Sequence, residues 1–219
     1  MGSVFVGPVR EKIQVAMGDL TRTFIEDTDV YGWIFDACQE IAKITECLTK
    51  EYNTLTVADQ EFYVIDHSIL RIVRVTYDGR KLDRISLNML DSIDPHRDKA
   101  GNSGVPTHYY MDGSELGLWK RPQSSDAALK VRARVLPTQL IENDFNVLEI
   151  PDIYQTNIIG YCVIQARHKD EAPEMMMMLM EGWKNSLATA KNIMDNPESS
   201  YASVTDIESM VDYTTDWYS

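Results

Sequence analysis

Residues 127–135 have the sequence AALKVRARV, and this stretch decides the fold class. Its apolar residues alternate with the cations Lys130, Arg132 and Arg134. A period of two places successive side chains on opposite faces of a strand, which predicts one buried face and one cationic face. Such a face is most simply solvated, but in an acidic chain it is also a natural docking surface for an acidic partner.

Further period-two patterns precede this strand. Asp78-Gly79 follows one of them, and Asp-Gly is typical of hairpin turns; Asp112-Gly113 marks a second turn. Ser86 is a suitable cap for a short helix through Leu90. The patterns therefore predict a β-rich insertion over residues 51–136. Its other expected strands cover residues 51–57, 61–65, 69–77, 107–111 and 115–119.

Helical patterns flank the insertion on both sides. Downstream of a cap near Asp29, apolar residues recur every three or four positions, as on the buried stripe of a helix. Pro151 opens a helix that is apolar around much of its circumference, so we expect it to be central. Pro197 ends the last helix. The four expected helices cover residues 8–18, 29–49, 151–169 and 173–196.

These elements predict an α+β fold. A helical body of two N-terminal and two C-terminal helices would carry an inserted antiparallel β-sheet or sandwich, followed by an extended C-terminal arm. We expect residues 1–196 to form one domain and residues 197–219 to form a partner-binding arm. From Glu198 onward the arm is acidic and has no Lys or Arg, yet it contains several large apolar residues. These candidate contact residues are Tyr201, Met210, Tyr213, Trp217 and Tyr218.

The charge balance narrows the function. The 219 residues include 21 Lys and Arg against 34 Asp and Glu, a net charge of -13 at pH 7. This disfavours a broad phosphate-binding surface, because affinity for nucleic acid depends on clustered cations. An acidic wall would instead let DNA slide past without binding, since like charges repel. No apolar run approaches the roughly 20 residues that span a bilayer, so we expect no membrane association and a cytosolic site of synthesis.

No catalytic, cofactor-binding or metal-binding residues are predicted. The cysteines Cys38, Cys47 and Cys162 lie within apolar helical patterns and are interpreted as buried free thiols. The four histidines never occur in pairs at metal-ligand spacing. Asp66 and His67 are adjacent, and their side chains would diverge on a strand.

The run Met175–Met180 has two interpretations. Methionine fills irregular cores well, and part of the run fits the buried stripe of the last helix. At this spacing some of the side chains must point elsewhere, towards a neighbouring subunit or solvent. Met175 and Met178 are therefore candidate subunit contacts.

In this order the predicted elements resemble the head-to-tail adaptor family of tailed phages, in particular the adaptors of short-tailed phages. The similarity extends over residues 9–196. It is carried by VYGW at 30–33, ACQEIA at 37–42, RIVRVTYDGRKL at 71–82, GVPTHYY at 104–110, LGLWKRP at 116–122 and IPDIY at 150–154.

The resemblance implies a non-enzymatic virion protein at the head-tail junction, assembled in the host cytoplasm. Members of this family form a homo-oligomeric ring, expected to be a dodecamer, beneath the portal protein. The ring would extend the channel for double-stranded DNA, without binding it specifically, and connect to a tail tube or nozzle protein for DNA ejection. The aromatic arm would then contact the portal.

Two other functions remain open from the residues alone. A stand-alone β-rich module that binds a glycan or peptide would need exposed aromatic residues among Tyr109, Tyr110, Trp119 and the loop 94–104. A hydrolase would need Asp66, His67 or His108 to converge in one pocket.

Overall fold

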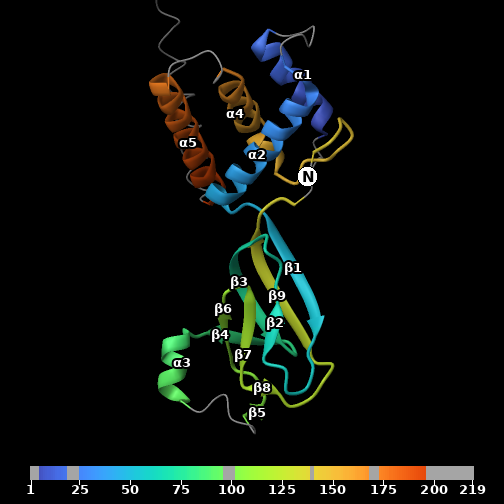
Figure 1. Cartoon of the computed structure of the whole chain (residues 1–219), viewed down its shortest axis with the longest axis vertical. Coiled ribbons are helices and arrows are strands. Elements are labelled where there is room, and N and C mark those ends of the chain that lie inside the picture. Colours follow the sequence, from blue (N-terminus) through green and yellow to red (C-terminus); the bar gives the residue numbers. More distant parts are fainter. Residues whose placement is uncertain (1–4, 19–24, 96–101, 139–140, 168–172, 196–219) are drawn as a thin grey trace, which may run out of the picture. The chain divides into compact units, whose positions relative to one another are not determined.

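The computed structural model describes residues 5–18, 25–95, 102–138, 141–167 and 173–195 (Figure 1). The chain divides into two compact units. A helical unit is formed by Met1–Thr45 and Gln139–Ser219, and a β unit is formed by Glu46–Thr138. The helices and the large curled sheet confirm the predicted α+β class. The predicted arm, residues 197–219, lies outside the described residues.

The helical unit is built around helix α4 (Gln155–Arg167). Helix α4 contacts α1, α2 and α5, as its apolar circumference predicted, and buries Ile158 and Cys162 among them. Pro151 precedes a 3-10 turn that leads into α4, so the helix itself begins later than expected. The elements of the unit are α1 (Val6–Met17), α2 (Asp27–Thr45), η1 (Asp152–Tyr154), α4 (Gln155–Arg167) and α5 (Pro173–Asp195).

Helix α2 ends four residues before the predicted position 49. The hydroxyl of Thr45 donates to the carbonyl oxygen of Ile41 at 2.7 Å, and Glu46 adopts a left-handed backbone with φ 52°. A residue in this conformation stops a helix, because the next N–H no longer points to the preceding turn. Thr49 therefore begins a strand, and the prediction that the helix extends to residue 49 is wrong.

A buried arginine joins α1 to two other segments of the helical unit. Arg10 is 3% exposed and donates two hydrogen bonds to the carboxylate of Asp144, at 2.7 and 2.6 Å. It also pairs with Asp27 at the start of α2, at 3.1 Å, and the Tyr31 hydroxyl donates to Asp144 at 3.0 Å. The bonds to Asp144 raise the pKa of Arg10 above its usual range. Sequence analysis missed this cluster.

The β unit is dominated by one seven-stranded sheet, with the order β1-β9-β3-β4-β6-β7-β2. The two-stranded sheet β5-β8 and the short helix α3 complete the unit. Ser86 caps α3 through a bond from the N–H of Met89, as predicted. The strands are β1 (Thr49–Leu55), β2 (Phe62–Val64), β3 (Ile69–Tyr77), β4 (Arg80–Arg84), β5 (Ser103–Gly104), β6 (His108–Asp112), β7 (Glu115–Trp119), β8 (Arg121–Pro122) and β9 (Ala128–Val135), and α3 covers Leu87–Ile93.

The sheet is mixed, whereas an antiparallel sheet was expected. The hairpin turns at Asp78-Gly79 and Asp112-Gly113 are confirmed, and Asp78 and Gly79 both have positive φ, as a tight hairpin turn requires. The exception is β6, which pairs parallel to β4. The chain between them passes through α3, and such a crossover is what a parallel pair requires.

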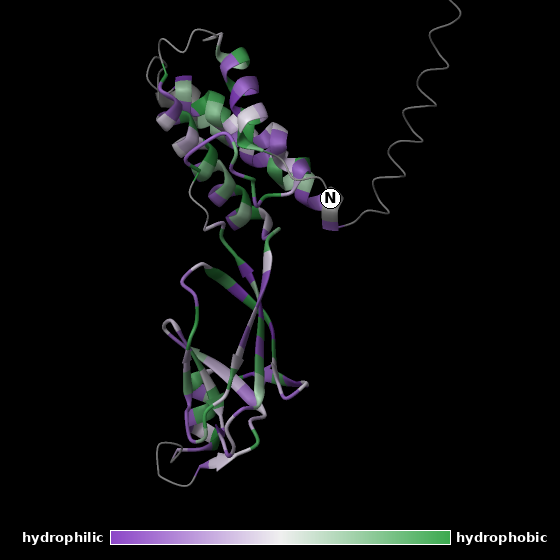
Figure 2. Cartoon of the chain, turned by 90° about the vertical axis from the view of Figure 1, so that its right-hand side faces the viewer, coloured by the Kyte–Doolittle hydropathy of each residue, from purple (hydrophilic) through white to green (hydrophobic). Residues whose placement is uncertain are grey.

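The main core of the β unit lies on the concave face of the sheet. Leu129 and Val131 of β9 and Val75 of β3 point into it. Figure 2 shows hydrophobic and hydrophilic residues alternating along the long strands, as the period-two patterns predicted. On β7, Gly117 lies opposite Tyr110 of β6, and the tyrosine ring occupies the space above the glycine. A Cβ atom at Gly117 would lie 2.2 Å from that ring.

Candidate interaction surfaces

The exposed face of β9 forms a cationic ladder with its neighbour β3. Arg132 lies opposite Arg74, and Arg134 lies opposite Arg71, because the two β-bulges of β3 bring these arginines into register. Lys130 is the third member of the ladder on β9. We call Arg71, Arg74, Lys130, Arg132 and Arg134 the cationic face. The sequence predicted the three residues on β9, but the two on β3 required the bulged register.

The members of the cationic face differ in their partners. Arg71 forms an ion pair with Glu46, and Arg134 donates to the hydroxyl of Thr49 at 2.5 Å. No ion pair joins Arg74, Lys130 or Arg132 to a carboxylate of the described residues, and all three are exposed. Together with Glu51 and Thr76 they line a hollow of about 150 Å³. This part of the face therefore has positive charge available for an acidic group.

The two edges of the seven-stranded sheet border a larger cavity. Strands β1 and β2 occupy opposite ends of the strand order. Residues of both strands, including Tyr52, Thr54, Tyr63 and Val64, line a cavity of about 370 Å³ whose floor is formed by Leu129 and other core residues. The cavity opens on the side of the sheet opposite the cationic face, since Tyr52 and Thr54 pair with the inward-facing residues of β9.

Helix α5 keeps part of its methionine run exposed. Trp183 and Leu187 are its buried residues within the described part; the Trp183 indole N–H donates to the carbonyl oxygen of Asn157 at 2.7 Å. Met177 and Met178 are 68% and 70% exposed. This exposure leaves Met178 available for a subunit contact. The side chain of Met175 lies outside the described part of the structure.

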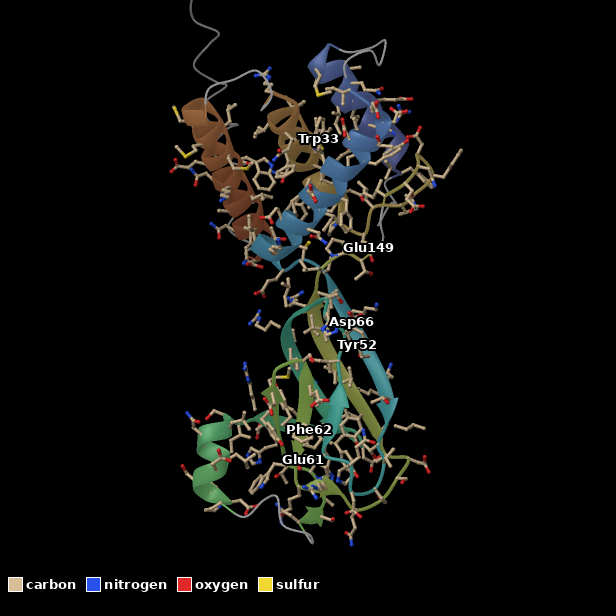
Figure 3. The ribbon with its side chains drawn as sticks, in the orientation of Figure 1. Trp33, Tyr52, Glu61, Phe62, Asp66 and Glu149 are labelled. Carbon is tan, nitrogen blue, oxygen red and sulfur yellow. The ribbon has the colours of Figure 1, made fainter. Side chains whose placement is uncertain are left out.

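The residues considered for hydrolysis do not share one pocket. Asp66 accepts hydrogen bonds from the N–H of Ser68 at 2.9 Å and from the Tyr52 hydroxyl at 3.3 Å (Figure 3). The bond from Ser68 lowers the pKa of Asp66 below its ordinary value. Asp66 and His67 are exposed and line a cavity of about 400 Å³. His108 is not among the residues that line it and contacts Trp119 instead, with the ring centroids 5.2 Å apart and the rings inclined at 59°. The three side chains therefore do not converge.

The two tyrosines of the aromatic cluster that a binding module would need are not on the surface, and Trp119 is partly buried. Tyr109 and Tyr110 are buried core residues, at 6% and 1% exposure. The Tyr110 hydroxyl donates to Glu61, which in turn pairs with Arg121 at 3.0 Å. The middle of the loop, residues 96–101, lies outside the described residues.

Within the described residues, no group of three His, Cys, Asp or Glu side chains is arranged to hold a metal ion. No helix in the same part of the chain is long and apolar enough to cross a membrane. All five predicted contact residues of the arm, Tyr201, Met210, Tyr213, Trp217 and Tyr218, fall outside the described residues.

A comparison with protein families matches residues 8–206 to the SU10 adaptor protein family. The chain belongs to the SU10 adaptor family. The match covers both compact units and confirms the predicted likeness to phage adaptors. An SU10 adaptor is a structural component of the phage virion and interacts with other head or tail proteins. A search of curated proteins found no match.

Proposed function

We propose that this SU10 adaptor forms a ring, most simply a dodecamer, beneath the portal at the head-tail junction. The ring would connect the portal to a tail tube or nozzle protein and line the channel through which double-stranded DNA is ejected. Subunits would assemble on the portal in the host cytoplasm. The observation that carries this proposal is the family match over residues 8–206, which covers nearly the whole chain.

Two properties of the chain support a channel-forming ring. A ring needs two different complementary patches on each subunit, and the exposed Met177 and Met178 supply apolar surface for one of them. Methionine adapts its shape to a partner at little cost, which suits a repeated contact. The net charge of -13 disfavours retention of DNA, because like charges repel at short range.

Electron microscopy of the protein mixed with purified portal tests the ring directly. We expect portal particles extended at one end by a ring of added density. Portal particles without added density, at protein concentrations well above the portal concentration, would contradict the proposal.

Substitution of the exposed methionines tests the subunit contact. Met178→Lys should weaken ring formation on the portal by about tenfold, since an interface methionine contributes on the order of 1–2 kcal/mol. Ala188→Lys adds the same charge at an exposed position of the same helix and is the matched control. Equal losses for the two variants would assign the effect to charge and remove Met178 from the interface.

Deletion of residues 198–219 tests the role of the arm. We propose that Tyr201, Met210, Tyr213, Trp217 and Tyr218 anchor the subunit to the portal, so the deletion should abolish portal binding. Hydrogen exchange in α4 and β3 of the deletion variant should match that of the full chain, because both compact units keep their sequence. Unchanged portal binding would exclude this role of the arm.

A further inference from the structure

The cationic face is an unmatched feature of a strongly acidic chain. Arg74, Lys130 and Arg132 form no ion pair with the described residues, although Asp and Glu outnumber Lys and Arg by 34 to 21. Neighbouring like charges repel one another, so a clustered set of exposed cations is stabilised by any acidic group that binds over it.

Strand β1 borders this face and has only one strand partner within the described residues. All of its residues except Tyr52 are exposed, and β9 is its single neighbour. A strand at a sheet edge presents unpaired N–H and C=O groups, which can pair with an added strand. A strand added at β1 would direct one set of side chains over the cationic side and the other set into the cavity beside Tyr52 and Thr54.

The end of the same chain has the matching two-sided pattern. Between residues 206 and 217 the acids Asp206, Glu208, Asp212 and Asp216 all occupy even positions. The odd positions include the apolar residues Ile207, Val211, Tyr213 and Trp217. In an extended conformation this segment would have an acidic face and an apolar face.

The segment is long enough to reach β1. Lys191 of α5 donates to the carbonyl oxygen of Ile44 at 3.1 Å, and only four residues separate Ile44 from the first residue of β1, Thr49. The chain from Ile44 to Thr49 spans at most about 18 Å, whereas the ten residues 196–205 span up to about 35 Å. Residue 206 can therefore reach β1. This argument uses only chain length and a contact inside the helical unit.

We propose that, in the isolated subunit, residues 206–217 add as a strand to the free edge of β1 in their own chain. The acidic side chains would lie on the side of the cationic face, and the apolar side chains would enter the cavity between β1 and β2. The intramolecular form is favoured because a tethered segment has an effective concentration in the millimolar range. This contact depends on neither the ring nor the portal.

Hydrogen exchange of the full chain, followed by mass spectrometry, measures the contact. If the tethered segment is docked about ten times as often as it is open, exchange in residues 206–217 should be about tenfold slower than in an unstructured peptide. The protection should be independent of protein concentration. Exchange at the unstructured rate would overturn the proposal, and protection that rises with concentration would show that a second copy supplies the segment.

Charge variants of the full chain identify the surface. The double variant Lys130→Glu, Arg132→Glu should remove the protection of residues 206–217 and of those N–H groups of β1 that do not pair with β9. Glu51 lies on the same face of the sheet, so Glu51→Lys should increase the protection several-fold. The exposed substitution Lys184→Glu reverses a charge in the helical unit and should have no effect.

A variant in residues 206–216 leaves the sequence of the β unit unchanged and so controls for misfolding of the sheet. Replacing Asp206, Glu208, Asp212 and Asp216 by their amides should abolish the protection while leaving exchange in β3 and β7 unchanged. Protection that survives both this variant and the double variant would exclude the cationic face as the docking surface.

Discussion

Gly117 lies beneath the ring of Tyr110, and the two residues pack as one unit across β6 and β7. The ring cannot move freely, because it is 1% exposed and its hydroxyl is bonded to Glu61. Gly117→Ala should therefore lower the free energy of unfolding by about 1–3 kcal/mol, the usual cost of overpacking a core. Urea denaturation measures this loss.

The pair can be tested for coupling. If the cost of Gly117→Ala comes from the Tyr110 ring, the same substitution in a Tyr110→Leu background should cost much less. Equal costs in both backgrounds would show that the added methyl group does not meet the ring.

Arg10 is a buried charge whose partners make it tolerable. Arg10→Ala would remove both of these bonds from the carboxylate of Asp144, whose side chain is 36% exposed and can still be hydrated, so we expect a loss of about 1.5–3 kcal/mol, the cost of a hydrogen bond to a charged group. We expect Arg10→Met, which fills the volume, combined with Asp144→Asn to recover most of this loss. Thermal unfolding of the single and double variants checks the prediction. A double variant that is no more stable than Arg10→Ala would contradict it.

Cys162 makes stability sensitive to alkaline pH. Burial raises the pKa of its thiol, so the folded state keeps the proton while the unfolded state loses it above about pH 8.5. The unfolded state then binds fewer protons, and stability falls by up to about 1.4 kcal/mol per pH unit. Cys162→Ala should flatten this dependence between pH 8.5 and 9.5 in urea titrations, whereas the partly exposed Cys47→Ala should retain it.

At the scale of the element, α5 is held to α4 largely through Trp183. The indole contacts Tyr161 at a ring distance of 5.1 Å and donates a hydrogen bond to Asn157. Trp183→Ala should cost about 3–5 kcal/mol, and Trp183→Phe should cost less, since it keeps the apolar contact and loses the bond. Chemical denaturation of both variants gives the comparison; equal costs would mean that the packing contributes little.

Local sequence patterns predicted which segments are helices and which are strands. The end of α2 and the direction of one strand pairing were predicted wrongly, because both depend on features that these patterns do not record. The helices and the longer strands were predictable, because apolar periodicity records which face is buried. The end of α2 at Thr45 depends on the left-handed backbone of Glu46, a residue with no compositional signal for it. The parallel pairing of β4 with β6 depends on the path of the crossover through α3, which no local pattern encodes.

At the scale of the whole molecule, the two compact units should respond to mutation independently. Gly117 and Trp183 belong to different units and share no partners. We therefore expect their effects on stability to add within about 0.5 kcal/mol, with faster hydrogen exchange confined to the mutated unit. Strong coupling between the substitutions would show that the units unfold as one.

Only part of the candidate surface could be predicted from the sequence. Lys130, Arg132 and Arg134 stand out because they alternate with apolar residues on one strand. Arg71 and Arg74 are separated by three positions, which on a regular strand would put them on opposite faces, and only the bulges of β3 bring them together. The sequence left open which side chains of the methionine run are buried; the structure exposes Met178 and buries Trp183 and Leu187 on the same helix, and the subunit contact of Met178 stays a prediction.

Thr49 and Arg134 are register partners at the base of β1 and β9. The chain therefore enters and leaves the β unit through two adjacent strands, about 5 Å apart, like the stem of a hairpin. Such a pair of strands keeps the two points of connection to the helical unit at the same spacing, whatever the length of the residues inserted between them. Residues 56–127 can thus lengthen, shorten or be exchanged during evolution without altering the gap that the helices must bridge, and we expect size differences among relatives to concentrate there.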